Sequence, residues 1–141
     1  MRFGVCAPPD TTADYLDAGI DYVEWPMSRT VGEMDDGAFA ELVALAGTLP
    51  VRPETWNVML PAALKVVGPE ADHGAMRTYL ERAFARAVRL GGEVVVFGSG
   101  GARTSPEGWS RDDAVSQFDD ACRVAGEVAA AHGITIAIEP L

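Results

Sequence analysis

The chain has 141 residues, 48% of them apolar and 23% charged, a balance that suits one globular domain and argues against disorder. Its net charge of −10 argues against nucleic acids and anionic membranes as partners, because those surfaces are bound through clustered Lys and Arg. No stretch reaches the roughly 18 consecutive apolar residues of a membrane helix, and no signal-peptide core follows the start. We therefore expect a cytoplasmic protein.

Short apolar runs alternate with longer amphipathic ones along the whole chain. The runs with strand character are residues 3–6, 22–25, 54–57, 94–97 and 134–138. This alternation is typical of repeated βα units around a parallel sheet. We expect about five parallel strands separated by four helices, in one domain covering residues 1–141.

Capping residues and apolar spacing place the four helices. The first is short and lies near residues 12–18, and the second begins at Asp35 or Asp36. The third runs from an Asp72 cap to Gly91, with a buried face of Met76, Tyr79, Leu80, Ala83, Phe84, Ala87 and Val88. On this helix we expect Arg77, Glu81, Arg82, Arg86 and Arg89 to face solvent.

The fourth helix runs from a Ser110 cap to Gly133. Its inward face is predicted to hold Val115, Phe118, Cys122, Ala125 and Ala129. The two cysteines, Cys6 and Cys122, lie far apart in the sequence and suggest neither a disulfide nor a zinc site. We expect both to be buried thiols.

The spacing of the strand starts is close to that of the (β/α)₈ TIM barrel, which spans about 250 residues. The chain would then supply only the N-terminal part of such a barrel. A doubly wound sheet stays open as an alternative, because it uses the same alternation. Its glycine-rich nucleotide turn is absent, since Ala7-Pro8-Pro9-Asp10 follows the first strand.

Glu139 is the leading candidate for a functional residue. It follows the β-branched run Ile134-Thr135-Ile136-Ala137-Ile138 and precedes Pro140, which cannot continue a strand ladder. The carboxyl ends of parallel strands are where such folds bind ligands and metals, so the position indicates an active-site carboxylate. A solvated carboxylate at a strand end is the alternative interpretation.

Other polar and aromatic residues follow the remaining strands. The candidates for substrate binding are Glu24, Trp56, Asn57, Ser99, Arg103 and Trp109. Asn57 could bind sugar hydroxyls, Arg103 a phosphate or carboxylate, and the two tryptophans the carbon face of a sugar. Each has a structural alternative: a turn residue for Asn57, an ion pair for Glu24, a solvated side chain for Arg103, and packing for the tryptophans. His73 lies at a helix start, away from any strand end, and is not expected to be a ligand.

Three segments together resemble the xylose isomerase-like TIM barrels, which include sugar phosphate isomerases and epimerases. They are Gly19-Ile20-Asp21-Tyr22-Val23-Glu24, Val94-Val95-Val96-Phe97-Gly98-Ser99-Gly100-Gly101-Ala102-Arg103 and Ile136-Ala137-Ile138-Glu139-Pro140-Leu141. The resemblance covers essentially the whole chain. It implies that Glu139 is a ligand of a divalent metal and an acid/base residue. The remaining ligands, an acid, a histidine and a second acid, would come from strands six to eight.

The resemblance implies a metal-dependent isomerase or epimerase acting on a sugar or sugar phosphate. The implied metal is Mn²⁺ or Mg²⁺, with Co²⁺ or Zn²⁺ as alternatives, and it would bind hydroxyl and carbonyl oxygens of the sugar. A carboxylate would remove the neighbouring carbon proton, and the resulting ene-diolate would be stabilised by the metal. One carboxylate cannot hold such a cation tightly, so the later strands are needed.

Several other functions stay open. The chain could be a non-catalytic half-barrel or fragment, forming a homo-oligomer or completed by another chain or by missing C-terminal strands, because open sheet edges invite association. It could also be a binding protein that has kept the barrel and lost catalysis. An endonuclease-type metal hydrolase is disfavoured, because Asn57 and Gly98-Ser99 stand where that branch of the family has histidines.

Overall fold

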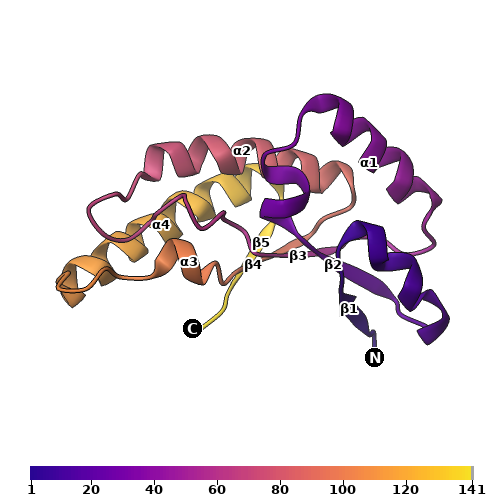
Figure 1. Ribbon diagram of the computed structural model, residues 1–141, viewed down its shortest axis with the longest axis horizontal. Coiled ribbons are helices and arrows are strands. Elements are labelled where there is room, and N and C mark those ends of the chain that lie inside the picture. Colours follow the sequence, from indigo (N-terminus) through magenta and orange to yellow (C-terminus); the bar gives the residue numbers. More distant parts are fainter. Residues whose placement is uncertain (141) are drawn as a thin grey trace.

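The computed structural model describes residues 1–140 and contains a five-stranded parallel sheet (Figure 1). The strands are β1 (Gly4–Cys6), β2 (Tyr22–Pro26), β3 (Thr55–Asn57), β4 (Val94–Phe97) and β5 (Thr135–Ile138). Their order in the sheet is the order in the sequence, β1-β2-β3-β4-β5. A doubly wound sheet would reverse its order at a switch point, so the observed order excludes that alternative and confirms a partial TIM barrel.

The helical segments connect the strands in the expected sequence. They are η1 (Pro9–Ala18), η2 (Ser28–Gly32), α1 (Asp36–Thr48), α2 (His73–Arg89), α3 (Gly100–Arg103) and α4 (Arg111–His132). The four predicted helices correspond to η1, α1, α2 and α4. The short segments η2 and α3 were not predicted, and they follow β2 and β4 directly.

The predicted caps are present at the three long helices. The side chains of Asp35, Asp72 and Ser110 each accept a hydrogen bond from the backbone N–H three residues later. Gly133 ends α4 with φ 70°, a conformation that glycine adopts without steric cost. These local signals explain why the helix starts could be predicted closely.

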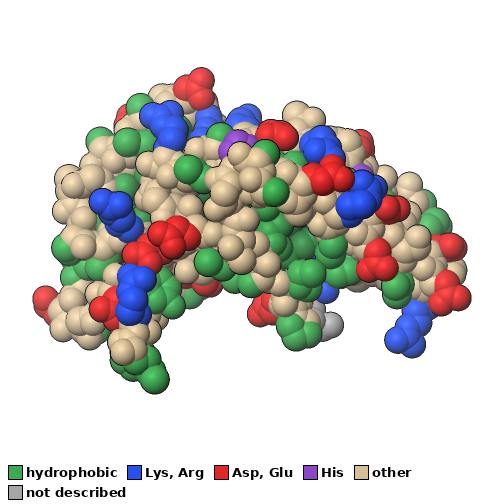
Figure 2. All heavy atoms as spheres, turned by 180° about the vertical axis from the view of Figure 1, so that it is seen from behind, with side chains coloured by type: hydrophobic (Ala, Val, Ile, Leu, Met, Phe, Trp, Pro, Cys, Tyr) green, Lys and Arg blue, Asp and Glu red, His purple; other side chains and the backbone are tan. Residues whose placement is uncertain are grey.

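The long helices cover one side of the sheet and leave the other side open (Figure 1). Figure 2 shows charged side chains over the helices and hydrophobic side chains along the lower, concave edge of the molecule. No described helix is long and apolar enough to cross a membrane.

Strand residues alternate between these two sides. Val23, Trp25, Trp56, Val95 and Phe97 are fully buried and belong to the core under the helices. Because successive strand residues point to opposite faces, the residues between them face the open side. We call this side the open face; in a complete barrel it would be the interior.

The open face corrects the prediction for Cys6. This residue pairs with Glu24 in the sheet register and is exposed, whereas a buried thiol was expected. In the described chain no second layer covers that face. Cys122 is partly buried on α4, where burial raises the pKa of its thiol.

Two of the predicted helix faces also need correction. Val88 and Val115 were expected inside but are 41% and 53% exposed. Arg86 was expected in solvent but is only 7% exposed. On α4 the predicted inward residues Ala125 and Ala129 are buried, and Phe118 and Cys122 are partly buried against the core. Ala121, Val124 and Val128 complete this face.

Arg86 is buried because it fastens the segment between β2 and α1 to α2. Its guanidinium donates hydrogen bonds to the carbonyl oxygens of Val31 (3.1 Å) and Met34 (2.7 Å), and to the Asp36 carboxylate (2.7 Å). It also lies over the Phe39 ring, 5.0 Å from the centroid. The charge is therefore compensated by acceptors that the sequence pattern does not reveal.

Tyr79 supports the same segment from α2. A Cβ at Gly32 would lie 2.2 Å from the Tyr79 hydroxyl, so only glycine permits this close approach. Burial raises the pKa of the Tyr79 hydroxyl. The η2 segment is thus held at a defined position above the end of β2.

Candidate functional site

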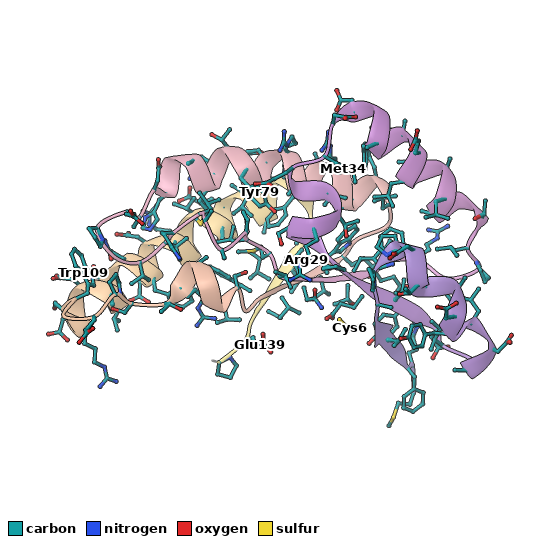
Figure 3. All side chains as sticks on the ribbon, in the orientation of Figure 1. Cys6, Arg29, Met34, Tyr79, Trp109 and Glu139 are labelled. Atoms are coloured by element: carbon teal, nitrogen blue, oxygen red, sulfur yellow. The ribbon has the colours of Figure 1, made fainter. Side chains whose placement is uncertain are left out.

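The open face collects polar side chains at the carboxyl ends of the strands. Cys6, Glu24, Asn57 and Glu139 all have the strand parity that directs them to this face. In Figure 3, Cys6 and Glu139 both lie on the side of the sheet away from α1 and α2. The sheet therefore places all four residues on one face, with Cys6 on the edge strand β1 and Glu139 after the opposite edge strand β5.

Glu139 sits over Gly98, the residue that follows β4. The register that pairs Phe97 with Ile138 places these two residues side by side. A Cβ at Gly98 would lie 2.2 Å from Glu139 Oε2, so the glycine provides the space for the carboxylate. We call this space above Gly98, which the side chain of any larger residue at position 98 would fill, the Glu139 seat.

Arg103 fixes the backbone around this seat. Its Nη1 donates to the carbonyl oxygens of Phe97 (3.0 Å), Gly98 (3.0 Å) and Glu139 (2.8 Å). Its guanidinium also lies 4.3 Å from the centroid of the Phe118 ring. Arg103 thus ties the end of β4 to the end of β5, which gives it a structural task beside the phosphate contact that its sequence position suggested.

A second group forms at the ends of β1, β2 and β3. Asn57 Nδ2 donates to Glu24 Oε1 (2.8 Å) and lies 2.7 Å from Cys6 Sγ. Because the amide nitrogen faces a carboxylate, the amide oxygen is left as an acceptor. That Oδ1 atom is buried and has no hydrogen-bond partner among residues 1–140. The contact with Glu24 therefore fixes the orientation of the Asn57 amide at the end of β3.

The backbone beyond β3 and β4 is strained. Val58 has φ 45° and Ser99 has φ 49°, and both are in the left-handed region that β-branched residues in particular avoid. Hydrogen bonds hold the two positions: Ser28 N donates to Val58 O (3.1 Å), and Leu60 N donates to Ser99 Oγ (2.9 Å). Such strain is concentrated at functional sites, where surrounding contacts enforce it.

The two predicted tryptophans lie apart from this group. Trp56 is fully buried on the helix side, edge-on to Trp25 with ring centroids 5.7 Å apart. Its Nε1 would lie 2.5 Å from a Cβ at Gly92, near the start of β4 rather than its end. Trp109 precedes α4 and lies at the left end of the molecule in Figure 3, away from Glu139. His73 Nε2 lies within hydrogen-bond distance of the Val66 carbonyl oxygen (3.0 Å).

A cavity of about 540 Å³ opens beside Asn57 and Cys6, between η1 and α1. Its walls are mainly apolar, and Arg29 lies at its border with a second cavity of about 690 Å³ between the loops after β2 and β3. No local sequence pattern predicts this space, because it is formed by loops whose positions depend on distant parts of the chain. The same holds for Gly98, whose role depends on a neighbour 41 residues away.

The open face of the described chain offers one candidate metal ligand, Glu139, but not the several ligands of a complete metal site. Among residues 1–140, no three His, Cys, Asp or Glu side chains are grouped closely enough to hold a cation. Glu139 offers a carboxylate with a fixed backbone and reserved space. Divalent cations such as Mg²⁺ and Mn²⁺ bind oxygen ligands of this type, but they need several.

The model of the xylose isomerase-like TIM barrel family matches residues 13–141. The chain belongs to this family. Leu141, the last residue of the third segment that carries the resemblance, lies outside the described residues. Comparison with curated proteins gave no significant sequence match.

Solved structures with the same fold include sugar epimerases. The 3-keto-D-glucoside 4-epimerase YcjR from E. coli matches 100% of this chain and 56% of its own, with 19% identity and a TM-score of 0.71. A D-psicose 3-epimerase crystallised in the presence of D-fructose matches 100% and 53%, with 14% identity and a TM-score of 0.78. A D-tagatose 3-epimerase-like protein matches 100% and 53%, with 19% identity and a TM-score of 0.71. The chain spans about half the length of these structures, and the likeness at such identities shows the fold.

The close approach of the Glu139 carboxylate to Gly98 can be tested by substitution. Gly98→Ala is expected to displace the Glu139 carboxylate, because the new Cβ occupies the place of Oε2. A misplacement of about 1 Å can cost about 10²-fold in rate, so the sugar isomerisation or epimerisation proposed below should slow by that order while the melting temperature changes little. Gly126→Ala, at an exposed position of α4 with no atom near the added Cβ, is the control. It should stabilise the helix by about 0.5–1 kcal/mol and leave activity unchanged. Equal activity in the two variants would show that the seat has no functional role.

Proposed function

We propose that the chain supplies β1–β5 of a sugar or sugar phosphate isomerase or epimerase. The observation that carries this proposal is the Glu139 carboxylate on the open face, seated over Gly98 at the end of β5. Family membership and the epimerases among the similar structures support it. Further strands, in a longer chain or a partner chain, would close the barrel.

In this proposal the residues at the ends of β2, β3, β4 and β5 have different roles. The Glu139 carboxylate exchanges a proton with the carbon next to the carbonyl group of the sugar. Asn57 lines the cavity at the end of β3 and lies next to the bound sugar, while Glu24 holds its amide in a fixed orientation. Ser99 and Arg103 position the end of β4.

A divalent cation, Mn²⁺ or Mg²⁺, would stabilise negative charge on the sugar oxygens as the proton leaves. Glu139 would be the ligand that this chain provides, and the other ligands would come from the strands that complete the barrel. The bare chain should therefore bind Mn²⁺ only weakly.

Deuterium exchange tests the proposal directly. The intact protein, by which we mean this chain together with the strands that close the barrel, is incubated in D₂O with Mn²⁺ and one sugar at a time. The sugars are D-fructose, D-psicose, D-tagatose and their phosphates. Deuterium is expected to enter a carbon beside the carbonyl of at least one sugar, as seen by NMR, and an EDTA-treated sample should show none. Failure of all these sugars to exchange, in a protein that binds Mn²⁺, would contradict the proposed reaction.

A second candidate is a half-barrel that works by pairing with another chain. The open strands β1 and β5 favour it, because each presents one edge without a neighbour in the described sheet. Light scattering of the 141-residue chain should then show a dimer or larger species. A well-behaved monomer over the micromolar range would argue against pairing.

A further inference from the structure

The apolar cavity beside the strand ends is in contact with the candidate site. Its lining includes Cys6 and Asn57, which also belong to the open face. From there it extends outward between η1 and α1. A ligand lying over the strand ends could therefore place a substituent in the cavity without leaving the site.

The walls of this cavity suit a group without hydroxyls. They are formed largely by Pro8, Pro9, Pro26, Met34, Leu42 and Leu45. A sugar hydroxyl buried against such side chains would lose its water without gaining a hydrogen bond, which is costly. An aromatic or alkyl group would gain from the same burial. Only part of the lining can form hydrogen bonds, at polar residues such as Asn57, Cys6 and Arg29.

The cavity is also preformed and large enough. About 540 Å³ lies within the range of pockets that bind drug-sized ligands, roughly 300–1,000 Å³. Three of the wall residues are prolines, whose fixed φ keeps the wall in place without loss of entropy on binding. On the opposite wall, the contacts of Arg86 with Val31 and Met34 hold the segment that carries Met34.

We propose that the substrate is a sugar bearing an aromatic substituent or an alkyl chain longer than a methyl group, and that this substituent binds in the cavity. The inference rests on the proposed sugar chemistry and adds the class of substrate to it. A small unsubstituted ketose would leave the apolar walls without a partner.

Binding of matched glycosides tests this inference without relying on turnover. Phenyl β-D-glucopyranoside and methyl β-D-glucopyranoside differ only in the group that would enter the cavity, and their affinities for the intact protein are measured by NMR titration. The phenyl compound is expected to bind at least about tenfold more tightly. Leu45→Gln should lower that affinity severalfold and leave the methyl compound unaffected. Leu45 is 40% exposed, so the substitution should not prevent folding.

Val115→Gln is the control, because Val115 is 53% exposed on α4 and does not line the cavity. Equal affinities for the two glycosides, or equal effects of the two substitutions, would overturn the inference. The experiments distinguish failure of this inference from failure of the proposed function. Deuterium exchange without a preference for the phenyl glycoside would refute only the binding of a substituent in the cavity. A Leu45-dependent phenyl preference without exchange removes only the isomerase chemistry.

Discussion

Glu139→Gln is expected to lower kcat/KM of the intact protein by roughly 10²–10⁴, the range that general acid–base groups contribute. The amide keeps the size of the side chain over Gly98 but cannot accept the carbon proton, and it is a weaker ligand for a divalent cation. The readout is the initial rate of deuterium entry from D₂O into the sugar that exchanges fastest.

Glu41→Gln is the matched control for this substitution. Glu41 is an exposed carboxylate on α1, and its side chain makes no hydrogen bond or salt bridge within residues 1–140. The control removes one negative charge without touching the open face, so its rate should equal that of the unaltered protein. Similar rates for both variants would mean that Glu139 is a solvated strand-end carboxylate.

Arg86→Met is expected to destabilise the protein by about 2–4 kcal/mol, measured by urea unfolding. The substitution keeps an apolar stem in the core but leaves the carbonyl groups of Val31 and Met34 without their donor. The Asp36 carboxylate is fully exposed and should contribute little to this loss. Proteolysis is expected to become faster in the segment between β2 and α1.

Arg89→Met provides the comparison for Arg86. Arg89 lies one turn later on α2 and over the same Phe39 ring, 4.9 Å from its centroid, but it is exposed. Its replacement should cost less than about 1 kcal/mol. A similar loss in both variants would indicate that the ring contact, and not the buried hydrogen bonds, holds this segment.

The sequence allowed the fold to be predicted where the signals are local. Strand β4 was predicted at its observed bounds, and α4 was predicted from its Ser110 cap to Gly133, because β-branched runs and caps depend on neighbouring residues. The family resemblance supplied the barrel, and the order of the five strands confirms it. The amphipathic pattern was less reliable at Arg86, because its acceptors come from a loop 50 to 55 residues earlier.

The candidate site was only partly predictable for the same reason. Strand position was sufficient to choose Glu24, Asn57 and Glu139, since parity and strand ends follow from the sequence. The seat at Gly98 and the exposure of Cys6 depend on the register between strands, which no single segment contains. Trp56 shows the converse, because one position along β3 moves a side chain from the open face into the core.

Titration of the intact protein with Mn²⁺, followed by electron paramagnetic resonance, tests the role of Glu139 most directly. If the carboxylate over Gly98 is a metal ligand, Glu139→Gln should weaken binding by at least about tenfold and Gly98→Ala should weaken it to a smaller degree. Glu41→Gln should bind as the unaltered protein does. Tight Mn²⁺ binding with the same affinity in Glu139→Gln would contradict the assignment of this residue to the active site.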